Sequence, residues 1–127
     1  MKYGNKKTLT SDGILHDSKK EADRWCQLKM LERAGKISDL QRQVPFELIP
    51  AQYITYERRG KNGRRLKDGK KCVEKSVVYI ADFVYNEFGR KVVEDVKSSA
   101  TAKKESYILK RKLMLWVYGI IIREWKE

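Results

Sequence analysis

The sequence predicts a mixed α/β (α+β) domain in which a central mixed β-sheet is flanked by helices. Three observations support this prediction. A capped helical segment lies near the start, the middle of the chain alternates as strands do, and a second helical segment precedes a short apolar run. The order helix, several strands, helix, strand is typical of a sheet covered by helices.

Length and charge limit what this domain does. The chain has 127 residues, which suit one domain with a real core. Its 29 lysine and arginine residues against 17 acids give a net charge of +12, so we expect a polyanionic partner, with nucleic acid ahead of acidic lipid. No apolar run is long enough to span a bilayer and no signal-peptide core is seen, so we expect a cytoplasmic protein without membrane contact.

The first predicted element is a helix that follows a polar segment. Residues 1–17 are basic and contain glycine, which predicts a flexible basic arm ahead of a single domain over 18–127. Ser18 and Glu21 have the spacing of a capping box, and apolar residues then recur at helical intervals up to Gly35. The expected helix covers residues 18–34.

Strand patterns occupy the middle of the chain. Residues 44–48 alternate as a half-buried strand does, and residues 53–57 extend the pattern. The segments 77–85 and 91–97 are rich in β-branched and aromatic residues. We expect them to form an antiparallel hairpin with a loop near 86–90.

A basic segment, residues 58–71, separates these two pairs of strands. Its density of glycine and positive charge predicts a solvated loop or hairpin tip. Charge of this kind suits contact with the DNA backbone better than base recognition. The DNA-binding residues expected in this loop are Arg58, Arg59, Lys61, Arg64 and Arg65.

The chain ends with a helix and a strand. Helical apolar spacing runs over 102–118 and closes at Gly119. The apolar run over 120–125 is then expected as a last strand.

The cysteine and histidine content argues against several catalytic classes. Cys26 and Cys72 lack metal-ligand spacing, and one histidine, His16, is too few for a zinc site of cysteine and histidine. His16 also lies in a polar segment without a partnered nucleophile, which argues against serine or cysteine hydrolase chemistry.

Two carboxylates and a lysine stand within the apolar hairpin segments. Buried carboxylates are costly unless they are paired or bind a metal, and two acids with a lysine suit a hard cation and an attacking water. Asp95 and Lys97 share one face of their strand, and Asp82 on the partner strand reaches the same place if the register is right. A simple ion pair is the alternative for Asp95 and Lys97, and Glu94 is the rival ligand if the register differs.

These residues resemble the PD-(D/E)XK nuclease superfamily, whose restriction-endonuclease-like core is helix, three-stranded meander, helix, strand. The aspartate of that motif corresponds to Asp82, and its acid-x-lysine part to Asp95, Val96 and Lys97; Ala81 stands where the motif has proline. Over residues 18–125 the chain resembles small phage and prophage proteins of this superfamily. It resembles more loosely the nuclease subunit of Tn7-type transposon ends and phage junction resolvases.

The resemblance implies further site residues. Nucleases of this type add an acid from the first helix, so Glu21 is expected as a metal ligand beside Asp82 and Asp95, with the Val96 carbonyl completing the set. A helix cap is the alternative for Glu21. The resemblance also places cations of the second helix near the site entrance as DNA contacts: Lys103, Lys104, Lys110 and Arg111.

The resulting expectation is a Mg²⁺-dependent DNA endonuclease in which Mn²⁺ substitutes and Lys97 serves the attacking water. The family likeness favours structure-selective cleavage of branched or recombining phage DNA, as in Holliday junction resolvases. One alternative is a nucleic-acid-binding accessory protein without catalysis, and another is a nuclease subunit that needs a partner for strand choice. A homodimer, and association with phage recombination or replication proteins, also stay open.

Overall fold

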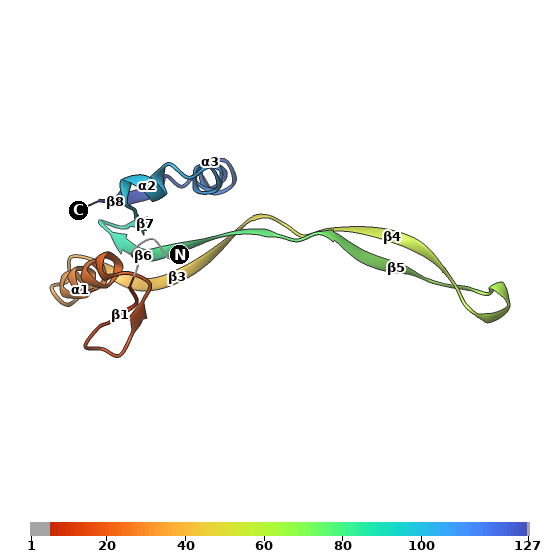
Figure 1. Cartoon of the computed structure of the whole chain (residues 1–127), viewed down its shortest axis with the longest axis horizontal. Helices are drawn as coiled ribbons and strands as arrows, with labels where there is room; N and C mark the ends of the chain where they lie inside the picture. Colours follow the sequence, from red (N-terminus) through yellow and green to blue (C-terminus); the bar gives the residue numbers. More distant parts are fainter. Residues whose placement is uncertain (1–5, 127) are drawn as a thin grey trace.

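The computed structural model describes residues 6–126. Its centre is a four-stranded mixed sheet in the order β3–β6–β7–β8, with helices on both faces (Figure 1). β6 (Val77–Glu87) pairs antiparallel with both β3 (Ser38–Ile49) and β7 (Arg90–Val96), and β8 (Arg123–Trp125) joins β7 in parallel. The prediction of a mixed α+β domain with a mixed sheet flanked by helices is therefore confirmed.

The hairpin of β6 and β7 has a tight turn. Phe88 and Gly89 join the strands, with φ values of 52° and 73°. Left-handed backbone at both positions is what a two-residue turn between twisted strands requires, and glycine adopts it without strain. The turn fixes the register of the two strands that carry the acids.

One face of the sheet is covered by α1 (Lys19–Arg33). The helix starts where the sequence predicts, because the Ser18 side chain accepts a hydrogen bond from the Glu21 amide at 3.1 Å. The Trp25 ring stacks on Phe83 of the sheet, with centroids 5.9 Å apart. The predicted helix is thus confirmed to within one residue at each end.

The other face is covered by α3 (Glu105–Tyr118), which follows the short α2 (Ser99–Ala102). The single helix expected over 102–118 is therefore two helices. Ser98 forms a capping box with the residue three positions on, which starts a separate short helix earlier than expected. Gly119, with φ 68°, ends α3 as predicted.

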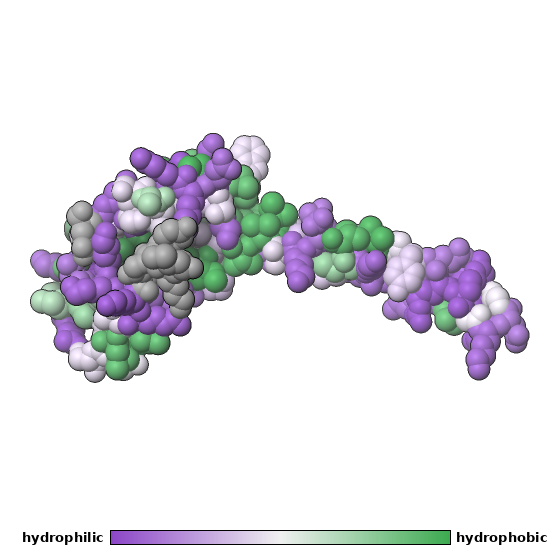
Figure 2. Space-filling view, viewed as in Figure 1, coloured by the Kyte–Doolittle hydropathy of each residue, from purple (hydrophilic) through white to green (hydrophobic). Residues whose placement is uncertain are grey.

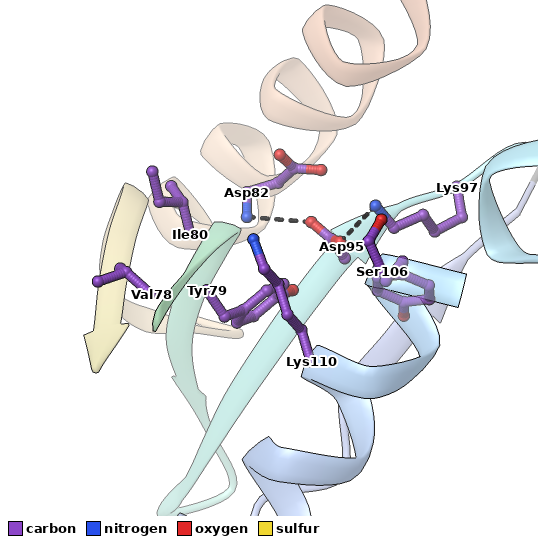
Figure 3. Close-up of a pocket in the computed structure, with 9 residues that line it drawn as sticks. Val78, Tyr79, Ile80, Asp82, Asp95, Lys97, Ser106 and Lys110 are labelled. Carbon is purple, nitrogen blue, oxygen red and sulfur yellow. Dashed lines mark hydrogen bonds and ion pairs between the residues drawn. The ribbon is translucent and has the colours of Figure 1, made fainter. Parts of the chain in front are cut away.

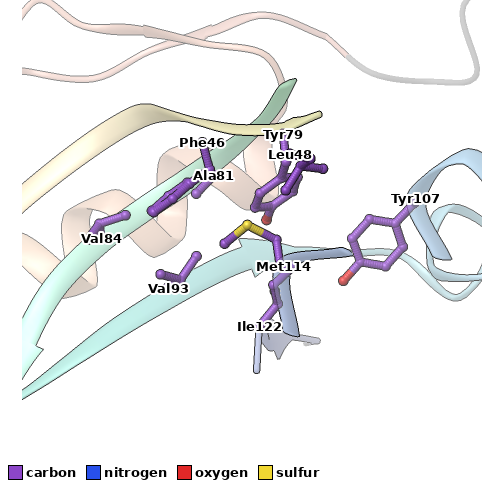
Figure 4. Close-up of a cluster of buried hydrophobic side chains, with 9 residues drawn as sticks. All are labelled: Phe46, Leu48, Tyr79, Ala81, Val84, Val93, Tyr107, Met114 and Ile122. Atoms are coloured by element: carbon purple, nitrogen blue, oxygen red, sulfur yellow. The ribbon is translucent and has the colours of Figure 1, made fainter. Parts of the chain in front are cut away.

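Two apolar clusters hold the layers together. The cluster on the α3 side is drawn in Figure 4 and contains Phe46, Leu48, Tyr79, Ala81, Val84, Val93, Tyr107, Met114 and Ile122. The cluster on the α1 side contains Trp25, Leu28, Ile37, Phe83 and Tyr85. Ile122 packs into the first cluster and Arg123–Trp125 pair with β7, so the last strand is shorter than the expected 120–125.

Residues 1–17 were predicted to form a flexible arm, and the structure corrects this prediction for the described part, residues 6–17. β1 (Thr8–Leu9) pairs with β2 (Leu15–His16), and this small hairpin lies against α1. The Trp25 indole donates a hydrogen bond to Asp12 at 2.6 Å, and His16 is buried. A buried tryptophan needs a partner for its N–H, so the helix orders a segment whose composition is polar. Residues 1–5 lie outside the described part.

Residues 58–71, predicted as a solvated loop or hairpin tip, form the outer part of a hairpin, and its strands are longer than the sequence predicts. β4 (Gln52–Arg59) and β5 (Arg65–Glu74) form a two-stranded ribbon joined by a short turn, η1 (Lys61–Gly63). This β4–β5 ribbon continues the β3–β6 pair and extends far from the body (Figure 1). Its strands do not show the alternation of a half-buried sheet, because β4 is exposed at every position.

Among residues 6–126, no helix combines the length and the apolar character needed to cross a bilayer.

Candidate active site

Asp82 and Asp95 stand opposite each other where β6 and β7 separate. The pairing of these strands extends from Glu87 and Arg90 at the turn to Phe83 and Glu94, and the two aspartates come one step beyond. There each carboxylate bonds the backbone of the other strand. Asp95 Oδ1 accepts a hydrogen bond from the Asp82 amide at 3.3 Å (Figure 3), and Asp82 Oδ2 accepts one from the Val96 amide at 2.9 Å. At this point carboxylate-to-amide hydrogen bonds connect the strands in place of backbone-to-backbone ones, and the two acids lie close together in a part-buried position.

Glu94 faces the opposite side of β7, toward α1. It is fully buried, and its carboxylate accepts hydrogen bonds from Arg24 Nε at 2.7 Å, Arg24 Nη2 at 2.8 Å and the Tyr85 hydroxyl at 2.7 Å. Strand alternation therefore places Asp95, and not Glu94, beside Asp82. The sequence left Glu94 open as the rival ligand, and the register keeps it away from that pair.

Lys97 lies on the same side as the two aspartates. Its ammonium group is 2.8 Å from Asp95 Oδ2 and 4.2 Å from the centre of the Tyr107 ring. The Tyr107 hydroxyl in turn donates to Glu124 Oε2 at 2.6 Å. A salt bridge, a cation–π contact and a hydrogen bond together hold this lysine against Asp95.

A pocket of about 280 Å³ opens over this group. Figure 3 shows Lys110 reaching from α3 toward the two aspartates, so one of the cations expected on the second helix does line the pocket. Ser106 also lines the pocket, and no role was predicted for this residue. The sequence feature that could have identified Ser106 is its position four residues before Lys110, because this spacing puts both side chains on one face of the helix. The complete lining is Val78, Tyr79, Ile80, Asp82, Asp95, Lys97, Ser106, Tyr107 and Lys110.

The two aspartates of the pocket repel each other, and of the two only Asp95 has an ion pair among the described residues. Burial raises the pKa of Asp82 to about 8, and the neighbouring Asp95 carboxyl adds to the rise. The Tyr79 hydroxyl is buried without a hydrogen-bond partner in residues 6–126, and burial and Asp95 raise its pKa as well. A proton or a cation between the acids would relieve this repulsion.

The donor set fits a magnesium-type ion. Mg²⁺ is commonly held by one or two carboxylates while it keeps several waters, and Asp82 and Asp95 supply two. Within residues 6–126, no three side chains of histidine, cysteine, aspartate or glutamate gather closely enough to hold a metal by themselves. A metal held by these two carboxylates would therefore need main-chain, water or substrate oxygen to complete its coordination.

Glu21 lies behind this pair with partners of its own. Its carboxylate accepts from Gln43 Nε2 at 2.8 Å and from the Asp17 amide at 3.3 Å, so the expected capping box is only half formed. Burial raises the pKa of Glu21, and the charge of Glu21 contributes to the raised pKa of Asp82. The structure thus puts Glu21 within electrostatic reach of Asp82, but its carboxylate is bound elsewhere.

Comparison with protein families identifies one match over nearly the whole chain. The family described as "Protein of unknown function (DUF1064)" matches residues 1–126. The chain belongs to the DUF1064 family. Searches of curated proteins and of solved structures found no match. The DUF1064 match includes every described helix and strand, and so both the pocket and the β4–β5 ribbon.

The other basic residues expected to bind DNA do not line the pocket of this DUF1064 chain. Lys103 and Lys104 are exposed where α2 meets α3, and Arg111 is 3.6 Å from Glu124. The loop residues lie at or near the far end of the β4–β5 ribbon: Arg58, Arg59, Lys61, Arg64 and Arg65. Among the described residues, the acidic pair of the pocket and the basic end of the ribbon are therefore two separate regions.

Proposed function

We propose that this protein is a Mg²⁺-dependent DNA endonuclease whose active site contains Asp82, Asp95 and Lys97. The observation that carries the proposal is the acid pair at the point where β6 and β7 separate, with the lysine 2.8 Å from one acid. Acids that only stabilised the fold would be expected to have matched cations, as Glu94 has. The resemblance to PD-(D/E)XK nucleases supports the same assignment.

Each residue of the pocket has a distinct part in this proposal. Asp82 and Asp95 offer carboxylate oxygens to Mg²⁺ or Mn²⁺, and the Val96 carbonyl is the proposed main-chain ligand. The bound ion would lower the pKa of a water and stabilise charge on the phosphate. Lys97 orients the attacking water from its position against Asp95, and Lys110 holds a phosphate oxygen of the substrate.

Glu21 acts in this proposal through Asp82. The negative charge of Glu21 raises the pKa of Asp82 and so disfavours the ionised form of Asp82. It therefore strengthens the preference of Asp82 and Asp95 for a cation. A direct ligand role would require its carboxylate to leave Gln43 and Asp17. We therefore propose that Glu21 supports the metal site through its charge, without binding the metal itself.

The proposed substrate is DNA within a bacterial cell. The net charge of +12 favours a polyanion, and the likeness to phage junction resolvases favours branched or recombining phage DNA in the host cytoplasm. A homodimer, or partners from phage recombination or replication, would suit cleavage of two strands, and a subunit that needs such a partner would cut only in its presence.

A nucleic-acid-binding accessory protein without catalysis is the second candidate. The observation that favours it is that both acids have partners in the structure: Asp82 bonds the Val96 amide and Asp95 pairs with Lys97. In that case the acids would serve the fold alone, and their neutral forms would leave DNA binding unchanged.

A cleavage assay separates the two candidates. Purified protein is incubated with four-way junctions, nicked duplex, linear duplex and single strands, in Mg²⁺, Mn²⁺ or EDTA. We expect cleavage in either metal and none in EDTA, with loss in Asp95→Asn and Lys97→Ala. The matched control is Asp23→Asn, an exposed acid that forms a surface ion pair with Lys19, which should cut as wild type does. Cleavage that survives Asp95→Asn or EDTA would overturn the site. Absence of cutting in both metals would favour the accessory protein, unless neighbouring gene products restore it.

A further inference from the structure

The β4–β5 ribbon is an unusual element because it has no core of its own. Every residue of β4 is exposed, and β5 buries only Gly69, over which the Tyr56 ring lies. A two-stranded sheet without a packed face is marginally stable in water. A ribbon of this length therefore points to a binding partner that covers it.

The charge of the ribbon indicates the chemistry of that partner. Residues 52–74 contain eight lysine and arginine residues against three acids, which is a net +5 of the +12 of the chain. The ion pairs of the ribbon use Arg59 and Arg65. In the described chain, no ion pair or cation–π contact engages five other cations: Arg58, Lys61, Arg64, Lys67 and Lys71. Hydrophilic surface accordingly dominates the outer part of the ribbon (Figure 2).

The cations point to both sides of the ribbon. Lys70 is opposite Thr55 and Lys71 is opposite Ile54, so these two neighbouring lysines lie on opposite faces. A flat membrane or an acidic protein surface would meet one face only. A ribbon in a groove of duplex DNA has phosphates on both flanks, and the major groove of B-form DNA admits a two-stranded ribbon.

The ribbon also starts beside the proposed active site. Val78 and Ile80, near the beginning of β6, line the pocket, and β5 ends at Glu74. Eight residues of β4 at about 3.3 Å each give an arm of about 27 Å, which is the length of about eight base pairs. The duplex that passes the pocket can therefore continue along the arm.

We propose that the β4–β5 ribbon is an arm that lies in the major groove of B-form DNA, on the duplex flanking the phosphate that is cleaved. The inference rests on the proposed function, because it names the substrate of that site as DNA with a duplex flank of about eight base pairs. Duplex RNA is excluded from this mode, since the major groove of A-form RNA is deep and too narrow.

Binding in EDTA tests the arm without cleavage. The arm variant replaces Arg58, Lys61, Arg64, Lys67 and Lys71 by glutamine. The control variant makes the same change at five exposed cations of the body: Lys6, Lys20, Arg33, Lys36 and Arg90. Both lose the same charge. Affinity for a DNA duplex of about 40 base pairs, and for RNA of the same sequence, is measured by fluorescence anisotropy over a range of salt. Circular dichroism checks that each variant is folded.

The two variants should differ on DNA. We expect the arm variant to bind DNA about 10- to 100-fold more weakly and its salt slope to fall by about 3 to 4, because each lost phosphate contact removes about 0.9. The control variant should lose less than about threefold in affinity for DNA. The arm variant and the control variant should have similar affinities for RNA. Equal losses on DNA would overturn the arm, and equal losses of the arm variant on DNA and RNA would overturn groove binding. Cleavage by wild type and Asp95→Asn is scored separately, so either proposal can fail alone.

Discussion

Glu94 and Asp95 are adjacent on β7 and both are buried, yet the two faces of the strand give them opposite surroundings. On the α1 side, Glu94 meets the guanidinium of Arg24 and the hydroxyl of Tyr85, so its charge is matched and its oxygens are bonded. On the α3 side, Asp95 meets a second carboxylate, Asp82, and a single lysine.

The difference separates a charge that serves the fold from a charge that is available for chemistry. A buried acid that is fully paired with a cation does not need a further ligand, whereas two neighbouring acids of which only one has an ion pair bind a proton or a metal more strongly. The raised pKa of Asp82 is the measurable sign of this imbalance. Variants on each face should therefore change different properties of the protein.

The largest effect on stability is expected for Glu94→Ala. This change leaves Arg24 buried without its partner, and an uncompensated buried charge costs about 3–5 kcal/mol. Urea unfolding followed by tryptophan fluorescence, to which the buried Trp25 contributes, measures the loss. Replacing both partners, Arg24→Met with Glu94→Leu, is the control and should recover most of the stability. A loss below about 1 kcal/mol in the single variant would show that the pair does not hold the sheet to α1.

The second prediction concerns pH and the other face. Without metal, the folded protein keeps the Asp82 proton up to about pH 8, whereas the unfolded chain releases it near the ordinary value of 3.8. The stability due to this proton is complete below about pH 4 and is lost as the pH rises through about 8. Asp82→Asn keeps an acceptor for the Val96 amide without the charge. The stability advantage of Asp82→Asn over wild type should thus grow steadily as the pH rises from 4 to 8.

Thermal or urea unfolding in EDTA at several pH values measures that difference. Asp23→Asn is the surface control, and its difference from wild type should stay flat. Adding Mg²⁺ at pH 8 should stabilise wild type and leave Asp82→Asn unchanged. A flat pH profile for Asp82→Asn would mean that the two acids are not coupled.

The parts of the fold that could be predicted from the sequence are those set by local rules. The Ser18 cap and helical spacing gave the bounds of α1, and strand alternation put Asp95 and Lys97 on one face. Tight-turn residues gave the hairpin of β6 and β7, which places Asp82 opposite Asp95. The acid pair follows from these local patterns.

The parts that could not be predicted depend on contacts between distant residues. Arg24 and Glu94 are 70 positions apart, so neither neighbourhood shows that they pair. The hairpin of β1 and β2 is held in place by the Trp25 indole, which donates a hydrogen bond to Asp12. Residues 53–57 of the β4–β5 ribbon were predicted as a strand, but β5 was not, because its residues are charged and it has no buried face to impose alternation.

A smaller effect is expected for Tyr85→Phe, on the Glu94 face. The variant removes a buried hydrogen bond to a carboxylate but leaves Arg24 in place, so the free energy of unfolding should fall by about 1.5–2 kcal/mol. DNA cleavage per folded molecule should not change. Tyr107→Phe, which loses its bond to Glu124 on the other face beside Lys97, is the comparison. It should reduce cleavage more than Tyr85→Phe does; the reverse order would contradict the division between the two faces.

The smallest effect is expected for Lys110→Gln. The side chain lines the pocket without an ion pair among the described residues, so the fold should not depend on it and the free energy of unfolding should change by less than about 0.5 kcal/mol. Cleavage should fall about fivefold, which corresponds to about 1 kcal/mol for one phosphate contact in a pocket open to solvent. Lys112→Gln removes the same charge from the same helix at an exposed position outside the pocket, and should cut within about twofold of wild type. If the two variants cut alike, Lys110 would act through net charge and would not hold the substrate phosphate.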